Sequence, residues 1–80
     1  MKVHNIKVWP EYYKDLVTYT KTFELRKNDR NYCVGDLVTL EEYDPITGKY
    51  TGASFQVKIK YVLENPNFGL SKGYCVFNWE

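Results

Sequence analysis

The sequence has few of the residues that build metal sites or disulfide scaffolds. It contains a single histidine, His4, and two cysteines, Cys33 and Cys75. A disulfide-built fold needs more cysteines, and a zinc site needs more ligands than these three residues supply. We therefore expect two ordinary thiols in a reducing compartment, the cytoplasm, and neither a metal ion nor an organic cofactor.

Long hydrophobic runs and an excess of one charge are also missing. No apolar run approaches the roughly 18 residues of a membrane span, and the N-terminus lacks a signal-peptide pattern. We therefore expect no membrane partner, and we favour a monomer. Eleven Lys and Arg against ten Asp and Glu give a net charge of +1. This balance excludes a protein that coats nucleic acid by bulk charge, but it allows a local basic site.

Aromatic residues are abundant and make up 18% of the chain. Each buried aromatic side chain removes roughly 150–250 Å² from water. A few of them can therefore build the thin core that a chain of 80 residues allows. The sequence has no internal repeat and no linker, so we expect residues 1–80 to form one domain.

The pattern of apolar residues predicts one helix and several short strands. Pro10 suits the first turn of a helix, because its missing N–H costs nothing there, and Tyr13, Leu16 and Val17 then recur at helical spacing. The other segments alternate with the period of two that is typical of strands. Expected strands cover residues 3–8, 20–26, 37–43, 55–63 and 74–79, and the helix covers residues 11–20. This β-α-β-β-β-β order predicts a mainly β (α+β) fold, a small and mostly antiparallel barrel capped by the helix.

The densest charged segment is KTFELRKNDR, residues 21–30, with four cations and two anions. In its strand, Phe23 and Leu25 share a face with Lys21 and are expected to point inward, which brings the Lys21 ammonium to the rim of the core. Glu24 and Arg26 share the other face, where the planar guanidinium of Arg26 suits a phosphate or a base edge. The simpler alternative is a solvated strand edge whose charges cancel in pairs.

The loop that follows adds further candidate ligand-binding residues. Asn28 and Arg30 stand beside the charged strand, where loops often carry function, although Asn and Asp also make ordinary turns. Tyr32 is the tyrosine we expect to contact a ligand. We expect Trp9 to pack on the first turn of the helix, and His4 to be a hydrogen-bonded core residue.

The spacing Lys21-x-x-Glu24-x-Arg26, directly after a helix, resembles the signature of the ASCH superfamily, which is related to PUA domains. The segments KVWPEYYKDL, VGDLVTLEEYDPITGKYTG and FGLSKGYCVF extend the resemblance over nearly the whole chain. They are similar to a small bacterial and phage branch of unknown function, also described as activating-signal-cointegrator-like.

The resemblance implies a PUA-like barrel with a cleft beside the first helix, lined by Lys21, Glu24 and Arg26. It also implies binding of RNA or modified nucleotides. One branch of the superfamily removes the acetyl group of acetylcytidine nucleosides, with its catalytic Lys in the place of Lys21. This chain departs from the pattern at Tyr19, where the superfamily usually has Gly. It also has Glu24 where the deacetylating branch has Thr, and it lacks that branch's helical insert before the last strand.

Three functions follow as hypotheses. The first is an RNA- or nucleotide-binding module in which Arg26, Lys27 and Arg30 meet phosphate while Lys21 and Glu24 hydrogen-bond the base. The second is a small amidohydrolase of a modified nucleoside, with Lys21 as nucleophile or base and Glu24 as proton carrier. The third is a protein-interaction adaptor, which would carry an exposed apolar patch outside the cleft.

Overall fold

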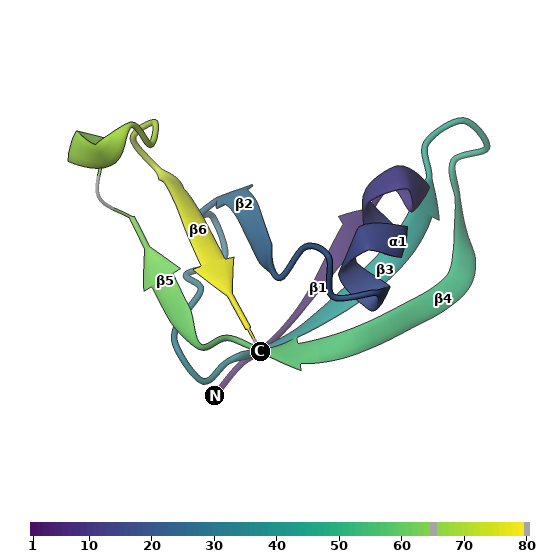
Figure 1. Ribbon diagram of the computed structural model, residues 1–80, viewed down its shortest axis with the longest axis horizontal. Helices are drawn as coiled ribbons and strands as arrows, with labels where there is room; N and C mark the ends of the chain where they lie inside the picture. The colour runs from purple at the N-terminus through teal and green to yellow at the C-terminus, as the bar shows by residue number, and fades with distance from the viewer. Residues whose placement is uncertain (65, 80) are drawn as a thin grey trace.

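Two three-stranded sheets and one α-helix make up the fold in a computed structural model that describes residues 1–64 and 66–79. The sheets diverge like the two arms of a V, with the helix against the first sheet (Figure 1). One sheet has the order β1-β3-β4 and the other β2-β6-β5. The elements are β1 (Val3–Val8), α1 (Pro10–Val17), β2 (Phe23–Lys27), β3 (Leu37–Asp44), β4 (Lys49–Lys58), β5 (Tyr61–Leu63), the 3-10 turn η1 (Pro66–Phe68) and β6 (Tyr74–Asn78).

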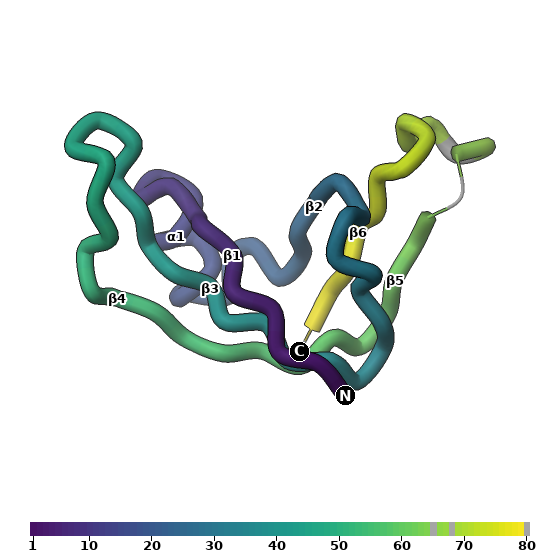
Figure 2. The backbone as a smooth tube through the Cα atoms, turned by 180° about the vertical axis from the view of Figure 1, so that it is seen from behind, coloured from purple at the N-terminus to yellow at the C-terminus, as the bar shows by residue number. Residues whose placement is uncertain are grey.

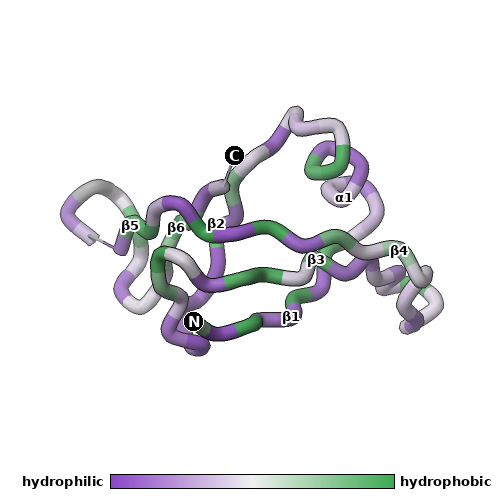
Figure 3. Tube along the Cα trace, turned by 90° about the horizontal axis from the view of Figure 1, so that it is seen from below, coloured by the Kyte–Doolittle hydropathy of each residue, from purple (hydrophilic) through white to green (hydrophobic). Residues whose placement is uncertain are grey.

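The first sheet combines one parallel and one antiparallel pairing. β1 runs parallel to β3, with Val3 opposite Leu37, and β4 returns antiparallel along β3. A parallel neighbour requires a long crossover, which here contains α1 and β2. Hydrophobic and hydrophilic residues alternate along these strands (Figure 3). His4, Ile6 and Val8 face the core as the sequence predicts, and the sheet order adds a parallel pair to the mostly antiparallel arrangement expected.

The segment predicted as one strand over residues 55–63 is divided between the two sheets. β4 begins earlier, at Lys49 after the Asp44–Gly48 turn, and ends at Lys58. Ile59 still exchanges backbone hydrogen bonds with the Gly35–Asp36 turn, whereas the Lys60 N–H donates to the Asn78 carbonyl of the second sheet. The chain therefore changes sheets between Ile59 and Lys60, which the unbroken apolar alternation of the sequence does not reveal.

The two sheets are not closed into a barrel. No strand pair joins them within residues 1–64 and 66–79, and the arms of the V remain separate in the view from behind (Figure 2). Buried side chains from both sheets and the helix fill the space between them. This core includes Leu16, Leu40, Ile59 and Phe77. The mainly β class with one α-helix is confirmed.

The helix is shorter than predicted because the backbone turns sharply after Val17. Pro10 occupies the first turn, and Tyr13 and Leu16 are buried, but Val17 is 44% exposed. The Thr18 hydroxyl donates to the Lys14 carbonyl. Tyr19 then adopts a φ of 60°, a left-handed conformation that L-residues rarely take. The turn redirects the chain toward β2.

A buried hydrogen-bonded pair fixes the start of the first sheet. His4 Nε2 lies 2.8 Å from Asp36 Oδ2, and both residues are buried. The backbone N–H groups of Lys2 and Cys33 also donate to the Asp36 carboxylate. The His4 hydrogen bond, followed by that from Lys2, lowers the pKa of Asp36 to about 2. The prediction that His4 is a hydrogen-bonded core residue is confirmed.

Candidate functional site

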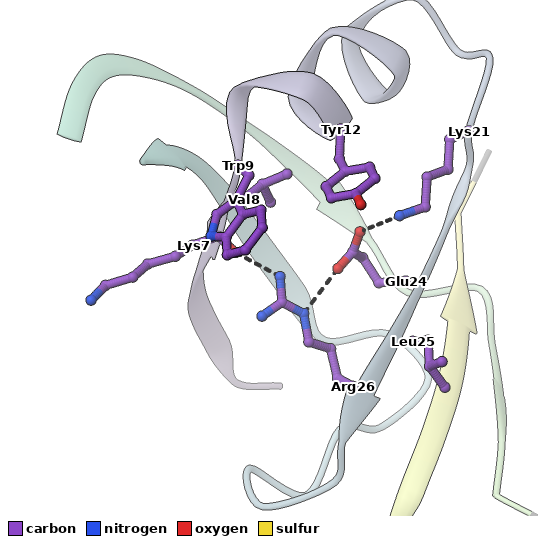
Figure 4. A pocket seen from close by; sticks show the side chains of 8 residues that line it. All are labelled: Lys7, Val8, Trp9, Tyr12, Lys21, Glu24, Leu25 and Arg26. Atoms are coloured by element: carbon purple, nitrogen blue, oxygen red, sulfur yellow. Dashed lines mark hydrogen bonds and ion pairs between the residues drawn. The ribbon is translucent and has the colours of Figure 1, made fainter. Parts of the chain in front are cut away.

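A hollow of about 330 Å³ lies where the end of β1, the start of α1 and β2 meet. Its size falls within the range of small-molecule binding sites. Residues from three elements that are separate in sequence form its walls, so only the fold brings them together (Figure 4). The lining residues are Lys7, Val8, Trp9, Tyr12, Lys21, Glu24, Leu25 and Arg26.

Glu24 provides a buried carboxylate between two cations. The residue is only 4% exposed. Lys21 Nζ donates to its Oε1 at 3.1 Å, and Arg26 Nε donates to its Oε2 at 2.9 Å. A buried carboxylate is costly unless it is paired and hydrogen-bonded. Here each oxygen has its own cationic donor, so the negative charge is compensated at both ends.

The orientation of β2 is the reverse of the one predicted. Glu24 points to the interior, whereas Phe23 is 48% and Leu25 54% exposed on the opposite face. Figure 4 shows Leu25 directed away from Glu24 and Arg26. Ion pairing within the same segment explains the reversal, because Lys21 and Arg26 offset the cost of burying Glu24. The expectation that Phe23 and Leu25 point inward is therefore wrong.

Lys21 is held by both its backbone and its side chain. Its N–H donates to the Asp15 carbonyl at the end of α1. Its ammonium lies 5.4 Å from the centroid of the Tyr12 ring and 5.3 Å from that of Phe23. These distances are within the range of cation–π attraction. The ammonium is thus oriented toward Glu24 while a quarter of its side chain stays exposed.

Arg26 connects the site to the first sheet. Besides its bond to Glu24, its Nη2 donates to the Lys7 carbonyl of β1 at 2.6 Å. Arginine has five N–H donors in a planar fork, and this arrangement leaves some of them free. The guanidinium therefore forms part of the wall and can also bind a ligand.

Two half-exposed aromatic rings form the side of the hollow nearest the helix. Trp9 is 50% and Tyr12 49% exposed. Their ring centroids are 6.5 Å apart and the planes differ by 25°. Our sequence interpretation assigned Trp9 a packing role and did not place Tyr12 in the site. The sequence feature that could have placed both residues in the site is their spacing of three at the start of a helix, which puts both rings on one face.

Comparison with known families identifies the chain at the level of family. Residues 3–79 match the family model described as Domain of unknown function (DUF3850). The chain belongs to this family. The DUF3850 chain is also similar to an uncharacterized 12.9 kDa protein in the GpA 3′ region of Escherichia phage P2, with 33% identity over 63 residues. The match covers 79% of the chain and 56% of the phage protein, so the chain spans little more than half of that relative.

A second hollow of about 540 Å³ holds most of the other predicted site residues of this DUF3850 chain. Lys27 and Arg30 border it together with Lys7 and Arg26, which also line the first hollow. Arg30 donates through Nη1 to the Asn5 carbonyl of β1. Lys27 is exposed and makes no side-chain hydrogen bond or ion pair within the described ranges.

Asn28 and Tyr32 take structural positions. The Asn28 amide donates to Glu64 Oε2 at 2.6 Å, and its oxygen accepts the Tyr32 N–H at 3.0 Å. The Tyr32 ring is 4% exposed and packs against the rings of His4 and Phe77. Burial raises the pKa of its hydroxyl. The ring belongs to the core, but Tyr32 also borders the second hollow, so its contact with a ligand stays a prediction.

No cluster of three or more His, Cys, Asp or Glu side chains suited to a metal occurs among the residues that the structure describes. Cys33 is exposed and Cys75 is buried, and both are free thiols. Burial raises the pKa of Cys75. None of the described helices has the length and apolar character needed to cross a membrane.

Proposed function

We propose that the hollow between α1 and β2 binds a nucleobase, as part of RNA or of a nucleotide. One observation carries this proposal: two exposed aromatic rings stand beside a compensated carboxylate with spare hydrogen-bonding capacity. Base–aromatic stacking contributes about 1–3 kcal/mol per base. Trp9 and Tyr12 supply that surface in a hollow large enough for a small ligand.

The charged residues supply polar recognition. Among the residues that the structure describes, one of the three ammonium donors of Lys21 bonds to Glu24. Arg26 keeps N–H groups beyond the two that contact Glu24 and Lys7. The carboxylate of Glu24 can accept further hydrogen bonds beyond the two from Lys21 and Arg26. Donors and an acceptor thus lie side by side, as the edge of a base requires.

The resemblance of the sequence to the ASCH superfamily supports the same function. Its signature residues Lys21, Glu24 and Arg26 line one hollow beside the helix. The superfamily pattern has Gly at the position of Tyr19, and Tyr19 has a φ of 60°, the conformation that glycine adopts without strain. Tyr19 therefore differs from the superfamily pattern in residue type but has a backbone conformation that suits glycine.

Binding is favoured over the amidohydrolase alternative. A lysine acts as nucleophile or base only as the free amine. Lys21 Nζ instead donates a hydrogen bond to Glu24 Oε1 at 3.1 Å. The lysine bonded to Glu24 is therefore suited to holding a ligand. If the protein did hydrolyse an acetylated nucleoside, the NMR titration would show the product.

The test is an amide-resolved NMR titration with the four ribonucleosides, their monophosphates and short single-stranded RNAs. We expect shifts at the amides of Trp9, Tyr12 and Lys21. Tyr12→Ala should weaken binding at least about fivefold, the lower end of the stacking energy. Tyr61→Ala is the matched control, since Tyr61 is 60% exposed on β5 and does not line the hollow.

Two results would contradict the proposal. In the first, no amide moves at millimolar ligand. In the second, Tyr12→Ala and Tyr61→Ala bind equally well, which would place the ligand elsewhere. The amide spectra of both variants report whether the fold is intact. New ligand signals that grow over hours would indicate catalysis.

A second candidate, the protein-interaction adaptor, is favoured by the outer face of the second sheet. Strand pairing puts Phe23, Leu25, Tyr61 and Tyr74 on this face, and all four are more than 40% exposed. Exposed apolar surface of this kind often marks a protein contact. The same titration separates the candidates, because a surface used only by proteins moves no amide when nucleotides are added.

A further inference from the structure

The two hollows share the same dividing wall. Arg26 lines both, with its guanidinium fixed between Glu24 and the Lys7 carbonyl. Lys7 also belongs to both, but its side chain points away from Trp9 and the first hollow (Figure 4). Its ammonium lies 4.5 Å from the centroid of the Tyr43 ring and 5.9 Å from that of Tyr50. A ligand that leaves the first hollow past Arg26 therefore meets the Lys7 ammonium next.

The second hollow has the chemistry of a phosphate and a further base. Four cations border it, Lys7, Arg26, Lys27 and Arg30, against the two anions Asp29 and Glu41. Tyr50 adds an aromatic ring that is 52% exposed. At about 540 Å³ against about 330 Å³, this hollow is larger than the first and has more room than one phosphate fills.

We propose that the ligand is a single-stranded nucleic acid of at least two nucleotides that occupies both hollows. One base stacks on Trp9 and Tyr12, the linking phosphate lies between Lys7, Arg26 and Lys27, and the next base lies against Tyr50. This inference rests on the proposed function, since it needs a base in the first hollow, and it adds a second binding site with its own residues.

Lys27 lies at the end of β2, on the sheet face that carries Tyr74, and its side chain borders the second hollow from there. The other cations of the second hollow already have contacts. Arg26 bonds to Glu24 and to the Lys7 carbonyl, Arg30 bonds to the Asn5 carbonyl, and the Lys7 ammonium lies over the Tyr43 ring. Lys27 has no side-chain hydrogen bond or ion pair in the part of the chain that the structure describes. A phosphate bound there gains a charge-assisted hydrogen bond and breaks no existing one.

The experiment compares four classes of probe: the ribonucleosides, their 3′-monophosphates, their 5′-monophosphates and the dinucleotides ApA, CpC, GpG and UpU. Affinities are measured by NMR titration at low salt for the unmodified protein and its variants. We expect the best dinucleotide to bind at least about tenfold more tightly than its nucleoside, from one additional phosphate contact and one additional stacked base.

Lys27→Gln and Tyr50→Ala should each remove part of that gain and leave the affinity for the nucleoside unchanged. Lys58→Gln is the matched control, because Lys58 is an exposed lysine of β4 that borders neither hollow. Raising the salt concentration should weaken the dinucleotide more than the nucleoside, since only the dinucleotide engages the phosphate subsite.

The outcomes separate this inference from the proposed function. Equal affinities for nucleoside and dinucleotide, or a gain that survives both Lys27→Gln and Tyr50→Ala, would overturn the second subsite and leave the first intact. A monophosphate that shows the full gain would limit the second hollow to a phosphate and overturn the two-nucleotide ligand. If no probe binds, the proposed function is wrong and the inference falls with it.

Discussion

Glu24 is the residue on which the geometry of the site depends. Its carboxylate is almost fully buried, and its two oxygens hold Lys21 and Arg26 in fixed positions. Without it the two cations would lie close together with no charge between them. The resemblance to the ASCH superfamily implies that these three residues line one cleft, and the structure does bring them together in the first hollow. Their order around the carboxylate could not be predicted, because it depends on β2 facing inward at Glu24.

Tyr19 carries a backbone cost that can be measured. A left-handed conformation costs an L-residue other than Gly roughly 1–2 kcal/mol, part of which the greater entropy of unfolded Gly cancels. We expect Tyr19→Gly to raise the free energy of unfolding by about 0.5–1 kcal/mol in urea denaturation. Tyr19 is 65% exposed, so little packing is lost.

Asn31→Gly is the matched control, since Asn31 has a φ of 53° and asparagine tolerates this region better than tyrosine. Asn31→Gly should raise the free energy of unfolding by less than Tyr19→Gly does. A destabilising effect of Tyr19→Gly, or a larger gain at Asn31, would contradict the assignment of strain to Tyr19.

At the scale of elements, β2 shows what alternation can and cannot predict. The period of two correctly indicates a strand near Phe23, but the period alone does not say which face is buried. Apolar residues usually decide that question. Here Glu24 is buried while Phe23 and Leu25 are exposed. The ion pairs with Lys21 and Arg26 offset the cost of burying its charge, and these contacts form only in the folded chain.

The split of residues 55–63 has a similar origin. Apolar residues continue through this segment, so nothing in the pattern marks a break. The break arises because the backbone of Ile59 bonds to the Gly35–Asp36 turn and that of Lys60 to β6. Such long-range hydrogen bonds are properties of the tertiary fold. By contrast, the faces of β1 and the start of α1 at Pro10 depend on local pattern, and both were predicted correctly.

Two strand leucines test the orientation of β2. Leu40 of β3 is fully buried and Leu25 of β2 is 54% exposed. We expect Leu40→Ala to lower the free energy of unfolding by about 2–5 kcal/mol, and Leu25→Ala to lower it by less than about 1 kcal/mol. Urea denaturation of both variants measures the difference. Equal losses would mean that Leu25 is a core residue, as the alternation pattern alone suggests.

At the scale of the whole molecule, the buried pair of His4 and Asp36 joins the N-terminal strand to the turn before β3. Asp36 is ionised at neutral pH, so His4 Nε2 must be the donor in this hydrogen bond. The backbone N–H groups of Lys2 and Cys33 converge on the same carboxylate. Protonation of Asp36 would weaken all of these contacts together.

The pKa of Asp36 therefore predicts how stability depends on acid. The folded pKa is about 2 against a usual value of 3.8, so folding favours the ionised carboxylate. Its contribution is complete above the unfolded value and is lost as the pH falls from about 4 toward about 2. Denaturation curves across this range should show a fall in stability that Asp36→Asn reduces.

Asp29→Asn serves as the control, because Asp29 is exposed and no pairing of its side chain is described. It should leave the acid dependence unchanged. An NMR titration of the carboxyl carbons gives the pKa of Asp36 directly. A value near 3.8, or an acid dependence that survives Asp36→Asn, would contradict the prediction.

The two arginines near the site, Arg26 and Arg30, also cover the free edge of the first sheet. β1 is an edge strand of its sheet, and the free edge of such a strand can pair with a strand of another chain. The carbonyls of Asn5 and Lys7 lie on this edge, and Arg30 and Arg26 occupy them. Each guanidinium fills a position that an intruding strand would need for its own N–H group. The residues proposed to hold a ligand thus also protect an exposed sheet edge from aggregation.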